Sequence, residues 1–92
     1  MKFQWDQQKA AANEKKHGVS FPEAATIFAD PLELTLADPD HSEGEFRFIS
    51  MGMSATGRLL VVSYVEREAG VIRIISARQA TRQEQKFYEQ TH

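Results

Sequence analysis

Two apolar runs in the second half of the chain constrain its fold more than any other feature of the sequence. Leu59-Leu60-Val61-Val62 and Val71-Ile72-Arg73-Ile74-Ile75 are apolar on both faces or nearly so, which is typical of central strands. The links at 54–57 and 67–70 both end in glycine, which can take the positive φ that hairpin turns need. The pattern predicts an antiparallel sheet whose longest strands cover 46–53, 58–66 and 71–77.

Three helices are predicted from residues that cap helix ends. Asp6, Ser20 and Thr81 each precede a helical pattern, and their side chains can accept from the first free backbone amides. A glutamate follows Ser20 and Thr81 three positions later, as in a capping box, and Gly18 can end the first helix in a left-handed conformation. The predicted helices cover 7–16, 21–29 and 82–90.

Short strands are also predicted at 3–5 and 34–37, which gives the order β-α-α-β-β-β-β-α. This order indicates an α+β fold in which an antiparallel sheet packs against helices. A chain of 92 residues can bury one modest core, so we expect a single domain over 1–92. The third helix has only Phe87 and Tyr88 to bury and must therefore dock against the rest of the chain.

Composition excludes several classes of protein. The chain contains no cysteine, so disulfides and thiolate metal sites are ruled out. No run approaches the ~18 apolar residues that a membrane-spanning helix needs, and the first residues do not resemble a signal peptide. We therefore expect a cytoplasmic protein that does not associate with a membrane.

Charge is distributed unevenly along the chain. The net charge of −2 at first argues against a nucleic-acid partner, but residues 1–45 carry −5 and residues 46–82 carry +4. The basic segment holds six arginines and only two acids. A polyanion responds to the local field, so this segment could bind phosphate. Arginines whose long stems cover apolar surface beside strands would give the same pattern.

The acidic loop over 38–45 is a candidate metal or proton-transfer segment. A calcium loop needs glycine at its sixth position, where Glu43 stands, and a zinc site would need a second histidine near His41. We therefore predict no metal site and no cofactor. His41 remains a candidate for proton transfer, because an unperturbed pKa near ~6.5 suits acid–base catalysis, although a lone loop histidine is also a common surface residue.

Two arginines occupy positions that call for an explanation. Arg73 interrupts an apolar strand, where an unpaired guanidinium is costly, so it must face solvent, pair with an acid or line a groove. Arg78 lies just ahead of the cap at Thr81, where a strand end and a helix N-terminus converge, and phosphate favours such places. A salt bridge for Arg73 and a solvent contact for Arg78 explain the residues equally well.

Several short motifs follow one another along about residues 3–88. The motifs are Phe3-x-Trp5-Asp6, Lys9, Asn13, Lys16-His17-Gly18-Val19-Ser20-Phe21-x-Glu23-Ala24, Phe28-x-Asp30-Pro31, Asp40-His41-Ser42, Glu45-x-Arg47, Arg73-Ile74-Ile75-Ser76-Ala77-Arg78-x-Ala80-Thr81 and Glu84. Each is short, but in this order and at these spacings the chain resembles the BrnT toxin family. The resemblance covers nearly the whole sequence.

The resemblance implies both a fold and an activity. The expected fold is RelE-like, and the expected activity is that of a type II toxin, a metal-independent ribonuclease that cleaves RNA and inhibits translation. The implied partner is a cognate BrnA-like ribbon-helix-helix antitoxin that neutralises the toxin and through which alone it would meet operator DNA. RNA is the implied substrate. The acidic net charge departs from the basic character of RNA-cutting toxins with this fold.

The resemblance also implies that arginines on the sheet are needed for toxicity. RNA is cut when its 2′-hydroxyl attacks the adjacent phosphorus, a base removes the proton, an acid protonates the departing 5′-oxygen, and cations stabilise the phosphoryl oxygens. We assign the cationic role to Arg78 and Arg73 with support from Arg47, and proton transfer to His41, with Glu45 as a substitute base. The residues predicted to contact RNA outside this set are Arg58, Arg82 and Tyr88, of which Tyr88 is also a weaker candidate for proton transfer.

A different class of function is compatible with the same residues. A small sheet domain could bind a partner protein without catalysis and regulate DNA through a DNA-binding partner. Both readings predict a partner, and they differ in whether RNA is cut when that partner is absent.

Overall fold

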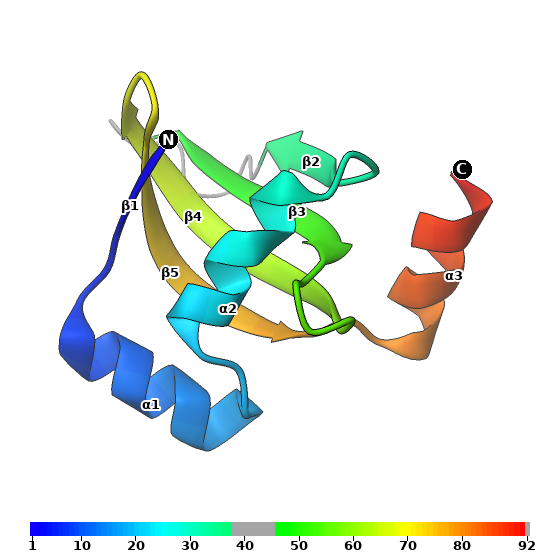
Figure 1. The fold of residues 1–92 in the computed structure, drawn as a ribbon, viewed down its shortest axis with the longest axis horizontal. Coiled ribbons are helices and arrows are strands. Elements are labelled where there is room, and N and C mark those ends of the chain that lie inside the picture. The colour runs from blue at the N-terminus through cyan, green and yellow to red at the C-terminus, as the bar shows by residue number, and fades with distance from the viewer. Residues whose placement is uncertain (38–45, 92) are drawn as a thin grey trace.

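The computed structural model describes residues 1–37 and 46–91 and has the predicted order of elements (Figure 1). A 3-10 helix, η1, continues directly from the second helix, so the prediction of one helix over 21–29 combined two elements. In chain order the elements are β1 (Lys2–Gln4), α1 (Gln7–His17), α2 (Phe21–Ala25), η1 (Thr26–Ala29), β2 (Leu34–Ala37), β3 (Arg47–Met53), β4 (Leu59–Glu68), β5 (Val71–Gln79) and α3 (Arg82–Gln90).

The five strands form one mixed sheet in the order β1-β5-β4-β3-β2. The pairs β2–β3, β3–β4 and β4–β5 are antiparallel, as predicted. The prediction of a wholly antiparallel sheet is wrong at one edge, because β1 pairs with β5 in parallel, with Phe3 opposite Ile72. β5 pairs with β4 on one side only, so β1 pairs along its other edge. There the ring centroids of Phe3 and Phe28 lie 5.5 Å apart.

Glycine turns join the three long strands. Gly57 and Gly70 have φ values of 85° and 82°, which confirms the prediction that glycine allows both hairpins. The second hairpin is tighter than predicted, since β4 continues to Glu68 and β5 begins at Val71. β5 is also longer than expected and ends at Gln79, close to the start of α3.

The helix ends follow the predicted capping residues with one exception. Asp6 accepts from the amides of Gln8 and Lys9, and Gly18 ends α1 with a φ of 69°. Thr81 and Glu84 form a complete capping box on α3. At α2, Ser20 accepts from the Glu23 amide, but the Glu23 carboxylate is engaged by the β3–β4 turn and does not complete the predicted box.

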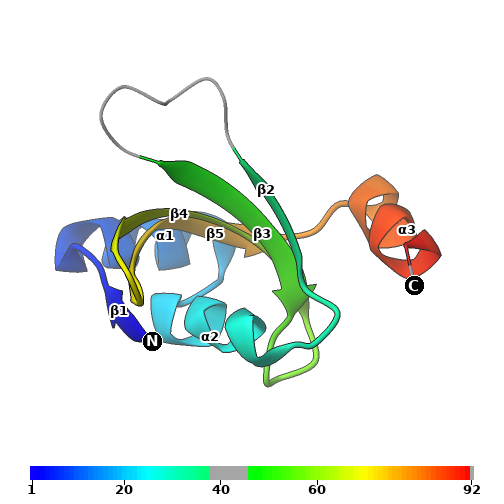
Figure 2. The ribbon, with the colours of Figure 1, turned by 90° about the horizontal axis from the view of Figure 1, so that it is seen from above.

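The core lies between one face of the sheet and the first two helices. Figure 2 shows α2 within the curve of the sheet. The side chain of Asn13 connects α1 to β5, because it donates to the Ala77 carbonyl at 2.8 Å and accepts from the Ala77 amide at 3.1 Å. Leu60, Val62 and Tyr64 of β4 point toward this core. The buried cluster also includes Val19, Phe21, Ala24, Ile27, Ile72, Ile74 and Ala77.

α3 stands apart from α1 and α2, beyond the end of β5, in both ribbon views. Tyr88 is its buried residue, and the Tyr88 hydroxyl donates to Asp30 at 2.6 Å. The prediction that Phe87 is buried with Tyr88 is wrong, because 54% of Phe87 is exposed. No helix within the described residues is long and apolar enough to span a bilayer.

Candidate functional site

A β-bulge in β5 places two of the predicted site arginines on the same face of the sheet. Arg73 and Arg78 are five residues apart, so in a regular strand their side chains would point to opposite faces. Ser76 pairs with Ser63 and Ile74 pairs with Tyr64, which leaves Ile75 as an extra residue between them. The bulge therefore turns Arg78 to the same side as Arg73, a device common beside functional sites.

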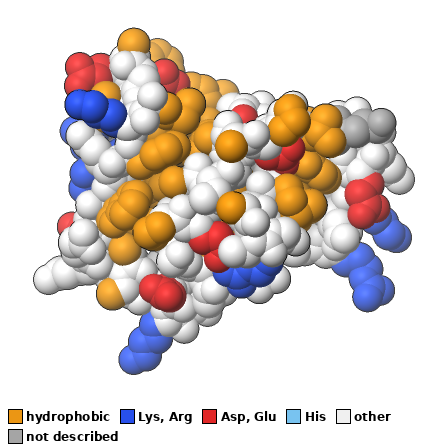
Figure 3. Space-filling model, in the orientation of Figure 1, with side chains coloured by type: hydrophobic (Ala, Val, Ile, Leu, Met, Phe, Trp, Pro, Cys, Tyr) orange, Lys and Arg blue, Asp and Glu red, His pale blue; other side chains and the backbone are white. Residues whose placement is uncertain are grey.

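The face opposite α1 and α2, called the open face below, carries these arginines in register with the neighbouring strands. Val65 of β4 pairs with Arg47 of β3 on one side and with Arg73 of β5 on the other, so the three side chains form one row. Arg47 and Arg73 are two strands apart, about 10 Å between backbones. Neither forms an ion pair with any residue in 1–37 or 46–91. On the helix-covered side in Figure 3, Lys and Arg side chains lie at several separate places.

Arg78 is held in place by the first turn of α3. Its two terminal nitrogens donate to the two carboxylate oxygens of Glu84 at 2.7 and 2.9 Å, and Nη1 also donates to the Gln79 carbonyl at 3.3 Å. A guanidinium has five N–H donors, and these contacts use three. The Nε–H and the second Nη2–H, which lie side by side, have no partner among the described residues. Arg78 thus retains a second two-pronged edge that suits a phosphate.

The Arg78–Glu84 pair also fixes the charge state of both groups. The hydrogen bond to Arg78 is the main reason that the pKa of Glu84 falls to about 2, and the Thr81 amide, which donates to Glu84 at 2.9 Å, lowers it further. The same hydrogen bond raises the pKa of Arg78. Arg78 therefore stays cationic and cannot act as an acid or base near neutral pH, so its chemistry is restricted to binding and stabilising negative charge.

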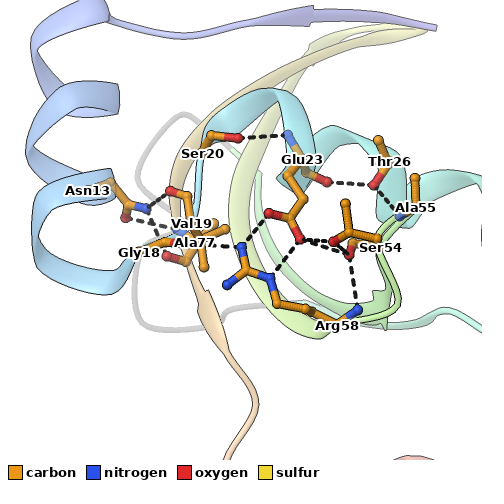
Figure 4. A network of polar contacts seen from close by, with 11 residues as sticks. Asn13, Gly18, Val19, Ser20, Glu23, Thr26, Ser54, Ala55, Arg58 and Ala77 are labelled. Carbon is orange, nitrogen blue, oxygen red and sulfur yellow. Dashed lines mark hydrogen bonds and ion pairs between the residues drawn. The ribbon is translucent and has the colours of Figure 1, made fainter.

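Arg58, predicted to contact RNA, lies in a polar network that connects α2 with the β3–β4 turn (Figure 4). It forms an ion pair with Glu23, with Nη2 on one carboxylate oxygen and Nε on the other at 2.9 Å, and Nη2 also donates to the Gly18 carbonyl at 3.1 Å. Ser54 and Thr56 donate to the same carboxylate. These contacts direct the Arg58 guanidinium toward the helix side, where it stabilises the turn.

The other two predicted RNA contacts lie on α3. Arg82 is exposed at the first position of the helix. Tyr88 is buried, and burial, reinforced by Asp30, raises the pKa of its hydroxyl to about 12. The Tyr88 hydroxyl is therefore a poor proton donor or acceptor at neutral pH, and its contacts are those of a residue that docks α3.

The predicted proton-transfer residues His41 and Glu45 lie in 38–45, outside the described residues. The candidate metal loop coincides with the same segment. Within residues 1–37 and 46–91, no group of three or more His, Cys, Asp or Glu side chains could hold a metal ion.

An apolar groove lies beside Arg78, between α3 and the open face, and is called the α3 groove below. Its volume is about 280 Å³. Val61 on its floor is the cross-strand partner of Arg78, and Glu84 on its wall is the residue that holds Arg78. The remaining lining residues are Leu34, Leu36, Ile49 and Met51 from the strands and Gln83 and Phe87 from α3.

Comparison with protein families assigns the chain to a known group. Residues 5–84 match the family described as "Ribonuclease toxin, BrnT, of type II toxin-antitoxin system". The chain belongs to the BrnT family. It is therefore a ribonuclease toxin of a type II toxin–antitoxin system, which decides between the predicted enzyme and the non-catalytic module and implies an antitoxin partner.

The fold of this BrnT chain agrees with that of a solved relative. The crystal structure of the Brucella abortus ribonuclease toxin BrnT aligns with a TM-score of 0.66 and 21% sequence identity, covering 89% of this chain and 99% of that chain. At this identity the match supports the shared fold alone. A search of curated proteins finds no match.

The sequence predicts the candidate arginines of this BrnT chain but not the residues that surround Arg78 in the structure. The sequence marks Glu84 as a helix cap and as one of the motif residues, but neither role predicts its contact with Arg78, although a spacing of six residues across a strand-to-helix junction allows that contact. Phe87 was expected in the core. The amphipathic pattern of α3 could not separate Phe87 from Tyr88, because adjacent positions on a helix lie only about 100° apart.

Proposed function

We propose that this BrnT toxin cuts RNA on the open face without a metal ion and thereby inhibits translation in the cytoplasm. The observation that carries the proposal is the free two-pronged edge of Arg78, which the β5 bulge turns to the open face and Glu84 holds rigid. A preorganised cation beside the reacting phosphate stabilises the charge that develops in the transition state, which is often the largest single contribution to catalysis.

In this mechanism Arg78 holds the scissile phosphate. The 2′-hydroxyl attacks the adjacent phosphorus, a base takes its proton, and the bond from phosphorus to the 5′-oxygen breaks as an acid protonates that oxygen. The products are a 2′,3′-cyclic phosphate and a free 5′-hydroxyl. His41 and Glu45 are the proposed proton-transfer groups, each worth about 10²–10⁴-fold when well placed.

Arg73 and Arg47 are proposed to bind neighbouring phosphates. Five residues of strand separate Arg73 from Arg78, a backbone distance of roughly 15 Å, so a single phosphate between them would need both side chains fully extended toward each other. Separate phosphates along one RNA strand fit this spacing better. Arg82, exposed at the start of α3, is proposed as a further phosphate contact.

The proposed partner is a BrnA-like ribbon-helix-helix antitoxin, through which alone the toxin would reach operator DNA. The RelE-like character of the fold belongs to the same proposal. It is supported by an antiparallel core of three long strands with two helices packed on one face.

Substitution of Arg78 tests the proposed site. Arg78→Ala is expected to abolish growth arrest and RNA cleavage on induction, while circular dichroism reports an unchanged fold. Arg78→Lys should restore little, because an ammonium is a point charge and cannot grip a phosphate with two parallel N–H groups. Lys15→Ala, on the exposed end of α1, is the matched loss of a cation and should leave cleavage at the parental rate.

A folded Arg78→Ala protein that cuts RNA at the parental rate would place the site elsewhere. Cleavage by the purified parent in excess EDTA is expected to continue, and its complete loss would contradict the metal-independent mechanism.

A further inference from the structure

We infer that the α3 groove is a nucleobase-binding subsite, in which a base of the RNA substrate stacks on Phe87 beside the phosphate held by Arg78. The inference rests on the proposed role of Arg78 and adds to it a determinant of RNA binding and base preference. It starts from an exposed aromatic ring. Phe87 is 54% exposed although it belongs to a helix that has few apolar residues with which to dock.

The groove adjoins the proposed phosphate site through two of its own lining residues. Val61 on the floor is the cross-strand neighbour of Arg78, and neighbouring side chains of this kind have Cβ atoms about 5 Å apart. Glu84 on the wall holds the Arg78 guanidinium directly. A phosphate on the free edge of Arg78 therefore places the attached nucleoside next to the opening of the groove.

The chemistry of the lining suits a base. Leu36 and Ile49 are exposed at 64% and 37% and continue the apolar surface from the strands toward Phe87. An exposed aromatic ring gives a base a π-face on which to stack, a contact shared by many proteins that bind single-stranded RNA. Gln83 adds an amide with both donors and an acceptor, which can hydrogen-bond to the edge of a base.

Charge favours RNA over an apolar protein segment as the occupant. The open face that continues from the groove carries Arg47 and Arg73, which have no ion-pair partner among the described residues, and Arg78 keeps two free donors. A polyanion with attached bases satisfies both the cations and the apolar groove at once. The family's activity requires that RNA bind somewhere on this chain.

Binding of a short single-stranded RNA that cannot be cut tests the inference. The probe carries 2′-O-methyl groups throughout, and its affinity for the full chain is measured by fluorescence anisotropy, while an unmodified copy reports cleavage. Phe87→Ala should weaken binding by about 5- to 150-fold, which corresponds to the loss of one stacked base. Phe87→Tyr keeps the aromatic ring and should restore most of the affinity.

Two further variants sharpen the result. Phe46→Ala removes another exposed phenylalanine, 75% exposed and outside the groove, and should change neither binding nor cleavage. Gln83→Leu should alter which base is preferred at one position next to the cut, when cleavage products of a mixed-sequence RNA are mapped. Circular dichroism and a melting curve for each variant report whether the protein is folded.

The outcomes separate this inference from the proposed function. If folded Phe87→Ala binds and cuts RNA like the parent while Arg78→Ala does not, the groove is not a base site and the proposed function stands. If Phe87→Ala impairs only neutralisation by the antitoxin, the groove binds protein and the inference is wrong. If the parent neither binds nor cuts RNA, the proposed function itself fails.

Discussion

Substitution of Glu23 by glutamine probes the network that anchors the β3–β4 turn to α2. The Glu23 carboxylate accepts from Arg58 on both oxygens, and from Ser54 at 2.9 Å and Thr56 at 2.6 Å. Glutamine has a similar size and keeps one acceptor oxygen, but its amide nitrogen cannot accept from Arg58. Glu23→Gln therefore removes the charge and part of the hydrogen bonding without creating a cavity.

The expected loss of stability follows from the pKa of Glu23. The Arg58 hydrogen bond is the main cause that lowers this pKa from 4.5 to about 2. At about 1.4 kcal/mol per pKa unit, the upper limit of the stabilisation at neutral pH is about 3.5 kcal/mol. Solvent screens the pair because Arg58 is 32% and Glu23 14% exposed, so we expect about 1–2 kcal/mol. For a domain of this size, that lowers the melting temperature by roughly 5–15 °C.

The same pKa sets the pH dependence of this stabilisation. Because the pKa of Glu23 is lower in the folded state than its ordinary value of 4.5, the stabilisation is fully present above about pH 4.5 and is lost as the pH falls toward 2. The difference in free energy of unfolding between the parent and Glu23→Gln should therefore be largest at pH 7 and smaller at pH 3.

Urea unfolding followed by far-UV circular dichroism at pH 7, 5 and 3 measures this difference. Glu14→Gln, which removes an exposed carboxylate from α1, is the matched control and should change stability by less than about 0.5 kcal/mol. Equal stability of Glu23→Gln and the parent at pH 7, or a deficit that does not shrink at pH 3, would refute the reasoning.

Two further predictions concern the supports of the proposed site. Glu84→Gln should slow RNA cleavage by about tenfold without raising KM, because Arg78 loses the carboxylate that orients it. In an Arg78→Ala background, the same substitution should cause no further loss of cleavage. Faster cleavage by Glu84→Gln would instead mean that Glu84 masks Arg78. Asn13→Ala should lower the free energy of unfolding by about 2–3 kcal/mol in urea titrations, because it leaves the buried Ala77 amide without its partner; a loss below 0.5 kcal/mol would show that the amide finds another acceptor.

Most of the secondary structure could be predicted because it depends on local interactions. A capping residue reaches an amide two or three positions away, as Asp6 and Thr81 do, and a glycine such as Gly57 permits a turn through its own φ. The three long strands and α3 accordingly lie within about two residues of their predicted bounds. The motifs that resemble BrnT toxins likewise identified the family later shown by comparison.

The candidate site depended on contacts between residues far apart in the sequence and on an extra residue that interrupts the regular period of a strand. No local sequence pattern predicts the bulge at Ile75, yet this bulge places Arg73 and Arg78 on the same face of the sheet. The Glu23 carboxylate binds Arg58, 35 residues away, in place of the predicted backbone amide, because the fold brings this cation within hydrogen-bonding distance. A distant contact likewise determines which aromatic residue of α3 is buried. The hydrogen bond from Tyr88 to Asp30 accompanies burial of Tyr88, and Phe87 is left exposed.

The sequence by itself thus determined which segments become helices and strands, most of their ends to within about two residues, and to which family the chain is similar. The tertiary structure alone decided the parallel pairing of β1, the face on which each arginine lies and the pairing of Arg78 with Glu84. The physical reason is that a cap or a turn is satisfied within four residues of chain. The partner of a guanidinium, or the packing of an aromatic ring, depends on which groups the tertiary fold brings next to it.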